Sequence, residues 1–182
     1  SVKKFKKIKK IFKSDIFKDI EKKINFELTS DQLKVIDEIN KDLKSDQKMF
    51  RLLQGDVGSG KTIVALVAIL SVIKSKFQVA FMAPTEILAK QHYNLAKKLF
   101  SKNIKIEILT SKTENRIRKR IINDLKNNSI DLLIGTHSLF QDKIEYKRLG
   151  LIIIDEQHKF GVKQRKKLSD KGGKNCDILV MS

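Results

Sequence analysis

The chain has 182 residues, of which 41% are hydrophobic, so it can form one domain with a substantial core, with or without an appendage. Its single cysteine excludes an internal disulfide and a cysteine-rich metal site, and its longest apolar run is far shorter than the roughly 20 residues that span a bilayer. The 39 Lys and Arg residues outnumber the 21 Asp and Glu residues, and the formal net charge of +18 favours a polyanionic partner such as nucleic acid.

Two details of the composition refine this view. The basic residues are mostly Lys rather than Arg, which is better suited to bidentate phosphate recognition, so part of the charge reflects a general richness in Lys, Ile and Asn. The lysine-rich N-terminus is not followed by the apolar segment of a signal peptide. We therefore expect a cytoplasmic protein with no membrane partner, for which nucleic acid is a candidate ligand.

Residues 1–24 differ in pattern from the rest of the chain. Apolar residues recur there at steps of three and four with lysines between them, which predicts a basic amphipathic helix. These apolar residues are Val2, Phe5, Ile8, Phe12, Ile16, Ile20 and Ile24. Such a helix can bind a membrane surface, resemble a calmodulin target or connect domains. We favour a connector helix that docks on the following domain, residues 25–182, because nothing else in the sequence indicates a membrane.

A second helix is predicted to begin near residue 29. Thr29 or Ser30 can cap its N-terminus, and apolar residues follow with helical spacing. These apolar residues are Leu33, Ile36, Ile39 and Leu43. Gln32 falls in the first turn, where it could hydrogen-bond the edge of an adenine, and Phe26 could stack on the ring. A solvent-facing Gln32 and a core Phe26 explain the spacing equally well.

The most specific motif is a glycine-rich segment between an apolar run and a long apolar helical pattern. Its residues are Gly55, Asp56, Val57, Gly58, Ser59, Gly60, Lys61 and Thr62, which fit G-x-x-x-x-G-K-[ST]. Glycines let successive backbone N–H groups point inward around phosphate oxygens, and the helix N-terminus adds its positive dipole. Lys61 can reach the β- and γ-phosphates, and the Thr62 hydroxyl can bind Mg²⁺. The segment therefore predicts binding of a nucleoside triphosphate.

Five further apolar runs follow this segment and alternate with helical patterns. They cover residues 78–83, 105–109, 130–134, 150–154 and 177–181. The first run leads into Pro84 and Thr85, which suit a helix start, and a basic helix with three arginines follows residue 113. The alternation predicts an α/β fold with a parallel sheet covered by helices on both faces. Polar motifs that follow the runs then lie at the carboxyl edge of the sheet, where ligands bind in open α/β folds.

The run at 150–154 leads directly into Asp155 and Glu156. A buried strand would deliver both carboxylates to the edge that holds the phosphate-binding segment. Asp155 is placed to hold Mg²⁺ through water, since Mg²⁺ prefers carboxylates and phosphates and keeps several waters. Glu156 is placed to polarise the water that attacks the γ-phosphate. Together with the glycine-rich motif, the pair favours ATP hydrolysis over ATP binding alone.

With these motifs in view, the chain resembles the first RecA-like lobe of superfamily 2 nucleic-acid translocases, and more narrowly the RecG family of bacterial ATP-dependent DNA helicases. The similarity covers roughly residues 26–182. It rests on LTSDQ (28–32), RLLQGDVGSGKT (51–62), MAPTEILAKQH (82–92), GTHSL (135–139), LGLIIIDEQHKFGVKQR (149–165) and ILVMS (178–182). Lys159 departs from the Arg usual in the family but keeps the charge. Transcription-repair coupling translocases share several of these motifs, but their pattern lacks the His that ends Asp-Glu-Gln-His.

The resemblance implies roles for individual residues. Gln32 would recognise adenine, and His158 would couple hydrolysis to movement. The ATP–Mg²⁺ site would be formed by Lys61, Thr62, Asp155 and Glu156. Contacts to the DNA backbone would come from Thr85, Ser111, Lys112, Gly135 and Thr136. Hydroxyls, backbone N–H groups and helix starts bind phosphate without reading sequence, but each of these five residues also fits a simple cap or turn.

The resemblance also implies what surrounds this lobe. In the family a DNA-remodelling wedge domain precedes the lobe, and a second RecA-like lobe follows it and supplies arginines that complete the ATP site. The chain by itself would then bind Mg-ATP weakly, turn over little ATP and bind DNA in a salt-sensitive way. The last strand, 178–181, should lie between the strand before the phosphate-binding segment and the strand that ends at Asp155.

The favoured interpretation is a helicase lobe that couples ATP hydrolysis to unwinding and branch migration of branched or forked DNA in recombination and repair. Two other classes stay open at this point besides the coupling translocases. One is a P-loop ATPase that does not act on nucleic acid, such as a small-molecule kinase. The other is a nucleic-acid binding module that keeps the motifs without catalysis.

Overall fold

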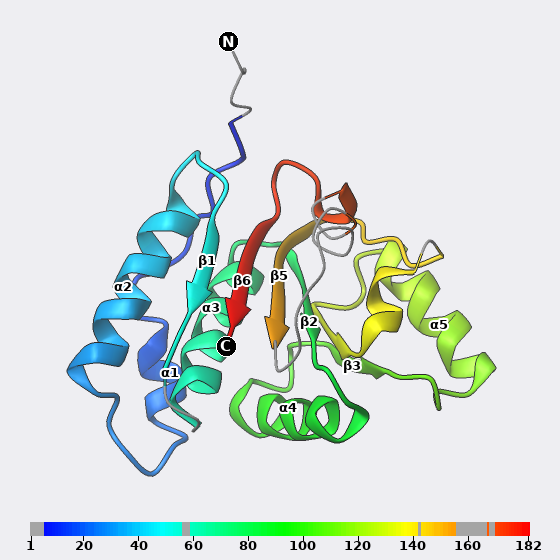
Figure 1. The fold of residues 1–182 in the computed structure, drawn as a ribbon, viewed down its shortest axis with the longest axis horizontal. Coiled ribbons are helices and arrows are strands. Elements are labelled where there is room, and N and C mark those ends of the chain that lie inside the picture. The colour runs from blue at the N-terminus through cyan, green and yellow to red at the C-terminus, as the bar shows by residue number, and fades with distance from the viewer. Residues whose placement is uncertain (1–5, 56–58, 142, 156–166, 168–169) are drawn as a thin grey trace.

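A computed structural model describes residues 6–55, 59–141, 143–155, 167 and 170–182. Within them, six parallel strands form one sheet in the order β1-β6-β5-β2-β4-β3 (Figure 1). The strands are β1 (Phe50–Leu53), β2 (Gln78–Met82), β3 (Ile106–Leu109), β4 (Leu132–Gly135), β5 (Leu149–Asp155) and β6 (Asp177–Met181). β6 lies between β1 and β5, so the predicted position of the last strand is confirmed.

Helices cover both faces of this sheet. They are α1 (Phe17–Glu21), α2 (Ser30–Lys44), α3 (Ser59–Lys74), α4 (Glu86–Leu99), α5 (Asn115–Lys126) and the 3₁₀ helix η1 (His137–Phe140). One apolar core joins α2, α3 and α4 to one face, and a second core joins α5 and η1 to the other. Figure 1 shows α2 beside β1 at one side of the molecule and α5 at the opposite side. The predicted α/β fold with helices on both faces is confirmed.

Burial explains why the strands appear in the sequence as continuous apolar runs. Every residue of β2, β4 and β6 is buried, because a parallel sheet packed on both faces leaves no solvent-facing side. α3 lies against the sheet and α2, which accounts for the nearly uninterrupted apolar run between Ile63 and Ile73. The edge strand β1 differs, since Phe50 and Leu52 are exposed.

The prediction of one helix over residues 1–24 is wrong for most of residues 6–24, the part of this segment that the structure describes. Residues 6–13 form no helix, and α1 spans only Phe17–Glu21. Backbone hydrogen bonds tie residues 6–13 to the end of α2 and the loop after it. Ile8 and Ile11 are 53% and 83% exposed, whereas two lysines of the same stretch are buried. Within residues 6–13, Ile8 therefore breaks the predicted apolar period, whereas Phe12 is partly buried against the core.

The two buried lysines, Lys7 and Lys10, contact a single carboxylate at the start of β6. Lys7 Nζ lies 2.7 Å from Oδ1 of Asp177 and Lys10 Nζ lies 2.7 Å from Oδ2, and all three side chains are fully buried. The Asp177 carboxylate also accepts a hydrogen bond of 2.7 Å from the Met49 backbone N–H. Burial lowers the pKa of Lys10, because the charged amine has lost its water. This ion cluster draws the lysines inward and explains why the segment does not follow the apolar period.

Beyond residue 13 the N-terminal segment joins the main core. Ile16 and Ile20 pack in the same apolar cluster as α2 and α3. The segment docks on the domain, as the connector interpretation predicts. Its secondary structure differs from that interpretation, because most of it is not helical. The division into residues 1–24 and 25–182 stays a prediction.

We expect Asp177→Asn to lower the free energy of unfolding by about 3–5 kcal/mol, the range for removing one partner of a buried ion pair. The amide carries no charge and leaves two buried ammonium groups uncompensated. Chemical denaturation followed by circular dichroism measures the effect. As a matched control, Asp37→Asn breaks an exposed pair with Lys41 at 3.1 Å and should change the free energy by about 0.5 kcal/mol or less. A loss below about 1 kcal/mol for Asp177→Asn would show that the cluster contributes little.

The neighbouring Cys176 supplies a second measurement of the same variant. Burial raises the pKa of its thiol to about 12, so almost no reactive thiolate exists at neutral pH while the domain is folded. Iodoacetamide should modify Cys176 slowly in the native chain and faster in Asp177→Asn, as followed by mass spectrometry. Equal rates in the two chains would contradict a loosened cluster.

Candidate functional site

The carboxyl ends of all six strands lie at one edge of the sheet. Because all pairings are parallel, the ends of β1, β6, β5, β2, β4 and β3 lie side by side in this order. At these ends the paired residues are Leu53–Met181, Met181–Asp155, Ile154–Met82 and Met82–Gly135. The segments that carry the predicted ATP and DNA residues therefore leave the sheet at the same edge.

Lys61 lies in the first turn of α3 and reaches the end of β6. Its Nζ donates a hydrogen bond to the backbone carbonyl of Ser182. Ser182 follows Met181, which pairs with Asp155 on the neighbouring strand. The Lys61 amine and the Asp155 carboxylate are thus on the same rim, as binding of one magnesium nucleotide by both residues requires.

The helix after the glycine-rich segment begins within the motif. α3 starts at Ser59, and its first turn includes Gly60, Lys61 and Thr62, all half-buried. The first N–H groups of an α-helix have no partner inside the helix and can bind phosphate. The motif residues outside the described part of the chain are Asp56, Val57 and Gly58.

A depression beside this turn is lined by Gln32, Gly55, Gly60 and Lys61, among others. Gln32 Oε1 accepts a hydrogen bond of 2.8 Å from the Thr29 N–H, and Gln32 Nε2 donates one of 3.4 Å to the Gly60 carbonyl. The Thr29 hydroxyl accepts a hydrogen bond from the Gln32 N–H, which completes a capping box. Gln32 is half-buried, and its carboxamide joins the start of α2 to the start of α3.

The described residues do not place three of the candidate site residues at this depression. Phe26 is 48% exposed, so its placement in the core is wrong, and it is not among the residues that line the depression. Glu156 and His158 lie outside the described residues.

Asp155 makes a contact that its sequence motif does not indicate. Nε2 of His92, a residue of α4, lies 2.8 Å from Oδ2 of Asp155. The His92 ring stacks on Phe81 of β2 with ring centroids 4.5 Å apart, and both side chains are buried. One signal could have found this residue, because a histidine stands among the inward-facing positions of an amphipathic helix. Those positions are Ala89, His92, Ala96 and Leu99.

The start of α4 lies beside the loop that follows β3. Thr85 caps the helix, since its hydroxyl accepts a hydrogen bond of 3.2 Å from the Leu88 N–H. Glu86 accepts a hydrogen bond of 2.6 Å from the Ser111 hydroxyl, and its other oxygen lies 3.5 Å from Lys112 Nζ. The hydrogen bond from Ser111 lowers the pKa of Glu86. Three of the five candidate DNA contacts thus gather around the first turn of α4.

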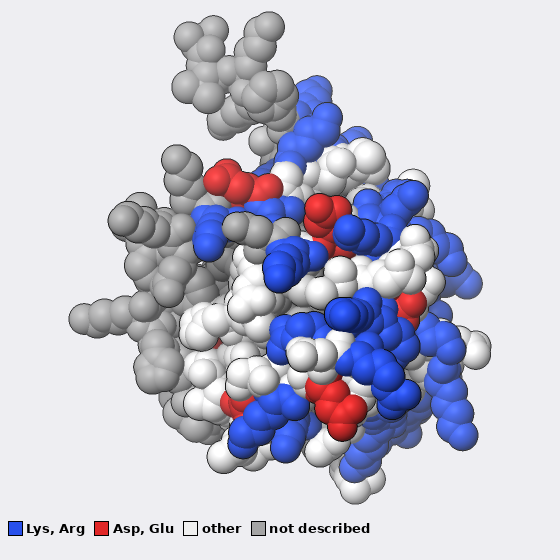
Figure 2. Space-filling view, turned by 90° about the vertical axis from the view of Figure 1, so that its right-hand side faces the viewer, with Lys and Arg blue, Asp and Glu red and all other residues white. Residues whose placement is uncertain are grey.

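Thr136 lines a second depression with basic walls, between α5 and η1. Ser111, Arg118, His137 and Lys143 also line it. Thr136 precedes η1, and its side chain makes no capping hydrogen bond there. Figure 2 views the molecule from the side of α5, where Lys and Arg side chains cover much of the surface with few carboxylates between them. A negatively charged chain is attracted to such a surface.

Gly135 is required by the packing of the sheet itself. A Cβ at this position would lie 2.1 Å from the backbone oxygen of Leu109 and 2.8 Å from Cδ2 of Leu139. The close approach of β3 to β4 therefore demands a glycine, whatever ligand binds beside it.

The described residues also bear on metal and membrane binding. No group of three His, Cys, Asp or Glu side chains among them is placed to hold a metal ion. A metal at Asp155 would therefore take further ligands from phosphates and water, which is the coordination that Mg²⁺ prefers. None of their helices has the length and apolar character needed to cross a bilayer.

Comparisons with known proteins point to one family and one fold. The family model described as DEAD/DEAH box helicase matches residues 29–182. The chain is 47% identical over 175 residues to the ATP-dependent DNA helicase RecG of Borreliella burgdorferi, which covers 96% of this chain and 25% of that protein. It is 51% identical over 162 residues to RecG of Thermotoga maritima, which covers 88% of this chain and 21% of that protein.

Two solved structures share the fold. A structure of RecG bound to a three-way DNA junction has a TM-score of 0.86 and 44% identity, over 98% of this chain and 24% of that one. A DEAD box protein from the hyperthermophile Methanococcus jannaschii has a TM-score of 0.69 over 94% of this chain and 48% of that one, and its 21% identity shows the fold alone. The chain spans about a quarter of the length of the RecG proteins that it matches. The resemblance to RecG-type helicases that the motifs indicate is confirmed.

We expect Gly135→Ala to lower the free energy of unfolding by about 1–3 kcal/mol, the usual cost of overpacking, because β4 must move away from the Leu109 carbonyl. Thermal or chemical denaturation of the chain without any ligand measures this loss. Gly55→Ala is the matched control, because among the described residues the nearest atom to its added carbon is 3.6 Å away, and its stability should change by less than about 0.5 kcal/mol. Unchanged stability in Gly135→Ala would contradict the packing role.

Proposed function

This chain belongs to the DEAD/DEAH box helicase family, and we propose that it is the ATP-binding lobe of a larger RecG-type helicase. The whole protein would couple ATP hydrolysis to unwinding and branch migration of DNA in recombination and repair. The observation that carries the proposal is the shared rim, where Lys61 reaches the end of β6 and Asp155 ends the neighbouring strand. A phosphate-binding segment and a metal-binding carboxylate can act on one nucleotide only if they meet in this way.

The phosphates of ATP would bind at the start of α3. Its first backbone N–H groups point toward an incoming anion, and the helix dipole favours negative charge there. Lys61 would exchange the Ser182 carbonyl for the β- and γ-phosphates. Gln32 would recognise adenine from the depression beside Gly60. The exposed Phe26, which does not line this depression, would stack on the ring.

Hydrolysis would use the carboxylates that follow β5. Thr62 and Asp155 would hold Mg²⁺, and the ion when bound compensates charge on the γ-phosphate. Glu156 would orient the attacking water, and His158 would link the ATP site to the next motif. Arginines of a second RecA-like lobe would complete the site in the larger protein, so this lobe alone would bind Mg-ATP weakly and turn over little of it.

DNA would bind along the side of the molecule that holds the first turn of α4 and the basic depression. The contacts to its backbone would come from Thr85, Ser111, Lys112, Gly135 and Thr136. They support recognition of the phosphate backbone without sequence preference, because hydroxyls, amines and backbone N–H groups do not read bases. A branched or forked DNA, the second lobe and a wedge domain would be the partners in the larger protein, which would work in the cytoplasm.

The two other classes are less well supported. A small-molecule kinase does not require a basic depression between α5 and η1. A non-catalytic nucleic-acid binding module does not require the Asp155 carboxylate on the same rim as Lys61.

We expect Lys61→Ala in the two-lobed helicase to reduce DNA-stimulated ATP hydrolysis by about 10²–10³-fold, the scale for losing one donor to developing charge. Binding of DNA without nucleotide should stay within twofold of the unmodified protein. Lys74→Ala is the matched control, because Lys74 is an exposed lysine in the last turn of the same helix and should leave hydrolysis unchanged. Full hydrolysis by Lys61→Ala would overturn the proposed ATP site.

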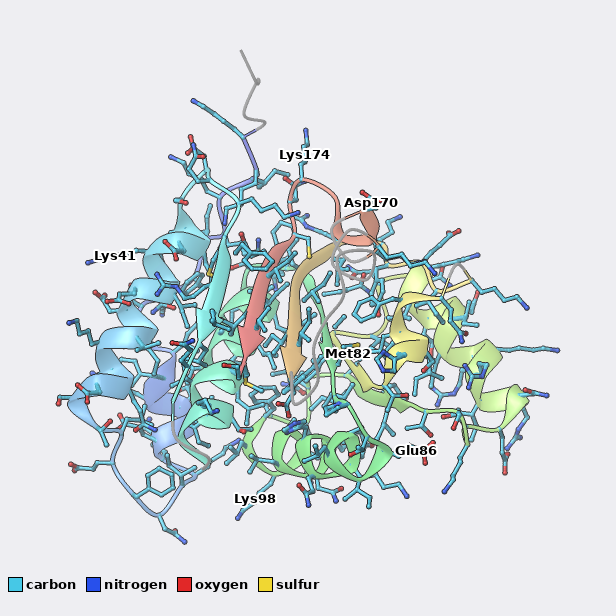
Figure 3. The ribbon with its side chains drawn as sticks, in the orientation of Figure 1. Lys41, Met82, Glu86, Lys98, Asp170 and Lys174 are labelled. Carbon is cyan, nitrogen blue, oxygen red and sulfur yellow. The ribbon has the colours of Figure 1, made fainter. Side chains whose placement is uncertain are left out.

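DNA binding should weaken steeply with salt, because each neutralised phosphate releases counterions. Lys112→Ala should reduce the slope of log affinity against log salt by about one unit without changing any sequence preference. Fluorescence anisotropy with a labelled fork at several salt concentrations measures this slope. Lys41→Ala is the control, since Lys41 lies on α2 far from Glu86 at the start of α4 (Figure 3). A DNA affinity that does not change with salt concentration would contradict the assignment of these residues to phosphate contacts.

A further inference from the structure

α4 touches both proposed sites. Its first turn holds Thr85 and Glu86, beside the loop that carries Ser111 and Lys112. About two turns or 10 Å further along, His92 contacts Asp155. Thr85 and His92 are seven residues apart and therefore lie on nearly the same side of the helix. Figure 3 shows Glu86 at one end of α4 and Lys98 at the other.

His92 is held firmly where it meets Asp155. The two atoms lie 2.8 Å apart, and the side chains of His92 and Asp155 are only 9% and 15% exposed. The ring stacks on Phe81 at an interplanar angle of 22°, and Phe81 pairs with Ile153 on the strand that carries Asp155. The imidazole thus touches β2 with its face and the end of β5 with its edge.

We infer that His92 is a positioning residue for ATP hydrolysis, which orients the Asp155 carboxylate and links it through α4 to the phosphate contacts of the bound nucleic-acid strand. The inference rests on the proposed function, because it assigns Asp155 to the metal. A hydrogen bond to one carboxylate oxygen leaves the other free and fixes its direction, as partners behind metal ligands do. His92 touches neither nucleotide nor water in this role.

Glu86 provides the two arrangements that such a link requires. Its carboxylate now accepts from the Ser111 hydroxyl and faces the Lys112 amine, which are the donors that a phosphate group would use. A DNA phosphate would compete with Glu86 for these donors and repel it. The first turn of α4 therefore has one set of contacts without DNA and another with it, and a ligand shifts an equilibrium only through such a difference.

Two amide variants of His92 in the two-lobed helicase test the role in positioning. The side chain of His92→Gln is long enough for its amide nitrogen to occupy the place of Nε2 and donate to Asp155. The side chain of His92→Asn is too short for its amide nitrogen to reach the Asp155 carboxylate. For His92→Asn we expect kcat of DNA-stimulated hydrolysis to fall about 10–100-fold and the Mg²⁺ concentration at half-saturation to rise about tenfold, the range for lost partners of metal ligands. His92→Gln should recover most of both, and DNA binding without nucleotide should stay within twofold in each.

The controls separate positioning from packing. Lys98→Ala, at the far end of α4, should behave as the unmodified protein. Thermal unfolding of each variant reports on packing. Equal losses in His92→Gln and His92→Asn, or unchanged kcat and Mg²⁺ dependence in His92→Asn, would overturn the inference. If Lys61→Ala abolishes hydrolysis while His92→Asn does not reduce it, only the inference fails; if Lys61→Ala hydrolyses ATP normally, the proposed function fails with it.

Glu86→Gln tests the link at the other end of the helix. The uncharged amide of this variant competes less with phosphate than the carboxylate does, so the DNA concentration at half-maximal stimulation should fall about two- to fivefold, the range of one exposed ion pair. In the double variant with His92→Asn the tighter DNA binding should persist, but kcat should stay at the His92→Asn level. A weaker affinity for DNA in Glu86→Gln would mean that Glu86 only orders the loop, and the link would be refuted.

Discussion

Parallel hydrogen bonding of β6 between β1 and β5 is the constraint on which the rest of this structure depends. The carboxyl end of β6 receives Lys61 from the phosphate-binding segment and lies beside Asp155. Its amino end carries Asp177, which holds Lys7 and Lys10. A strand paired on both edges and buried on both faces cannot slip by one residue without turning every side chain to the wrong face. The candidate ATP site is therefore built beside a strand that is fixed on both edges and both faces.

α4 is the second element that organises this edge, because it contacts both the loop after β3 and the end of β5. A helix transmits a displacement along its axis better than a loop does, since each N–H is bonded to the preceding turn. Its capped start lies beside hydroxyl and amine groups suited to phosphate, and its buried face carries His92 to Asp155. α4 therefore contacts both the proposed strand-binding surface, at its start, and the proposed nucleotide-binding rim, about two turns further along.

Local rules account for much of the site. Thr29 and Thr85 cap their helices as the sequence predicts, because a cap depends only on the few residues that follow it. The glycine-rich motif and the run before Asp155 likewise predict their own positions at the carboxyl edge. Gln32 shows the limit of such rules. Its capping box is a local pattern, but its contact with Gly60 depends on how α2 packs against α3.

The sequence by itself determined the fold class and the edge at which the candidate residues gather, because periodicity and motifs act over short stretches and parallel strands share one polarity. The expected position of the last strand came from the resemblance to RecA-like lobes, not from periodicity or motif spacing. Only the tertiary structure decided the contacts between distant residues. Helical spacing predicted a helix over residues 1–24, but Lys7 and Lys10 turn inward because Asp177, far along the chain, supplies their counter-charge. His92 and Asp155 meet for the same reason, since 63 residues separate them and only the packing of α4 against the sheet brings the imidazole to the carboxylate.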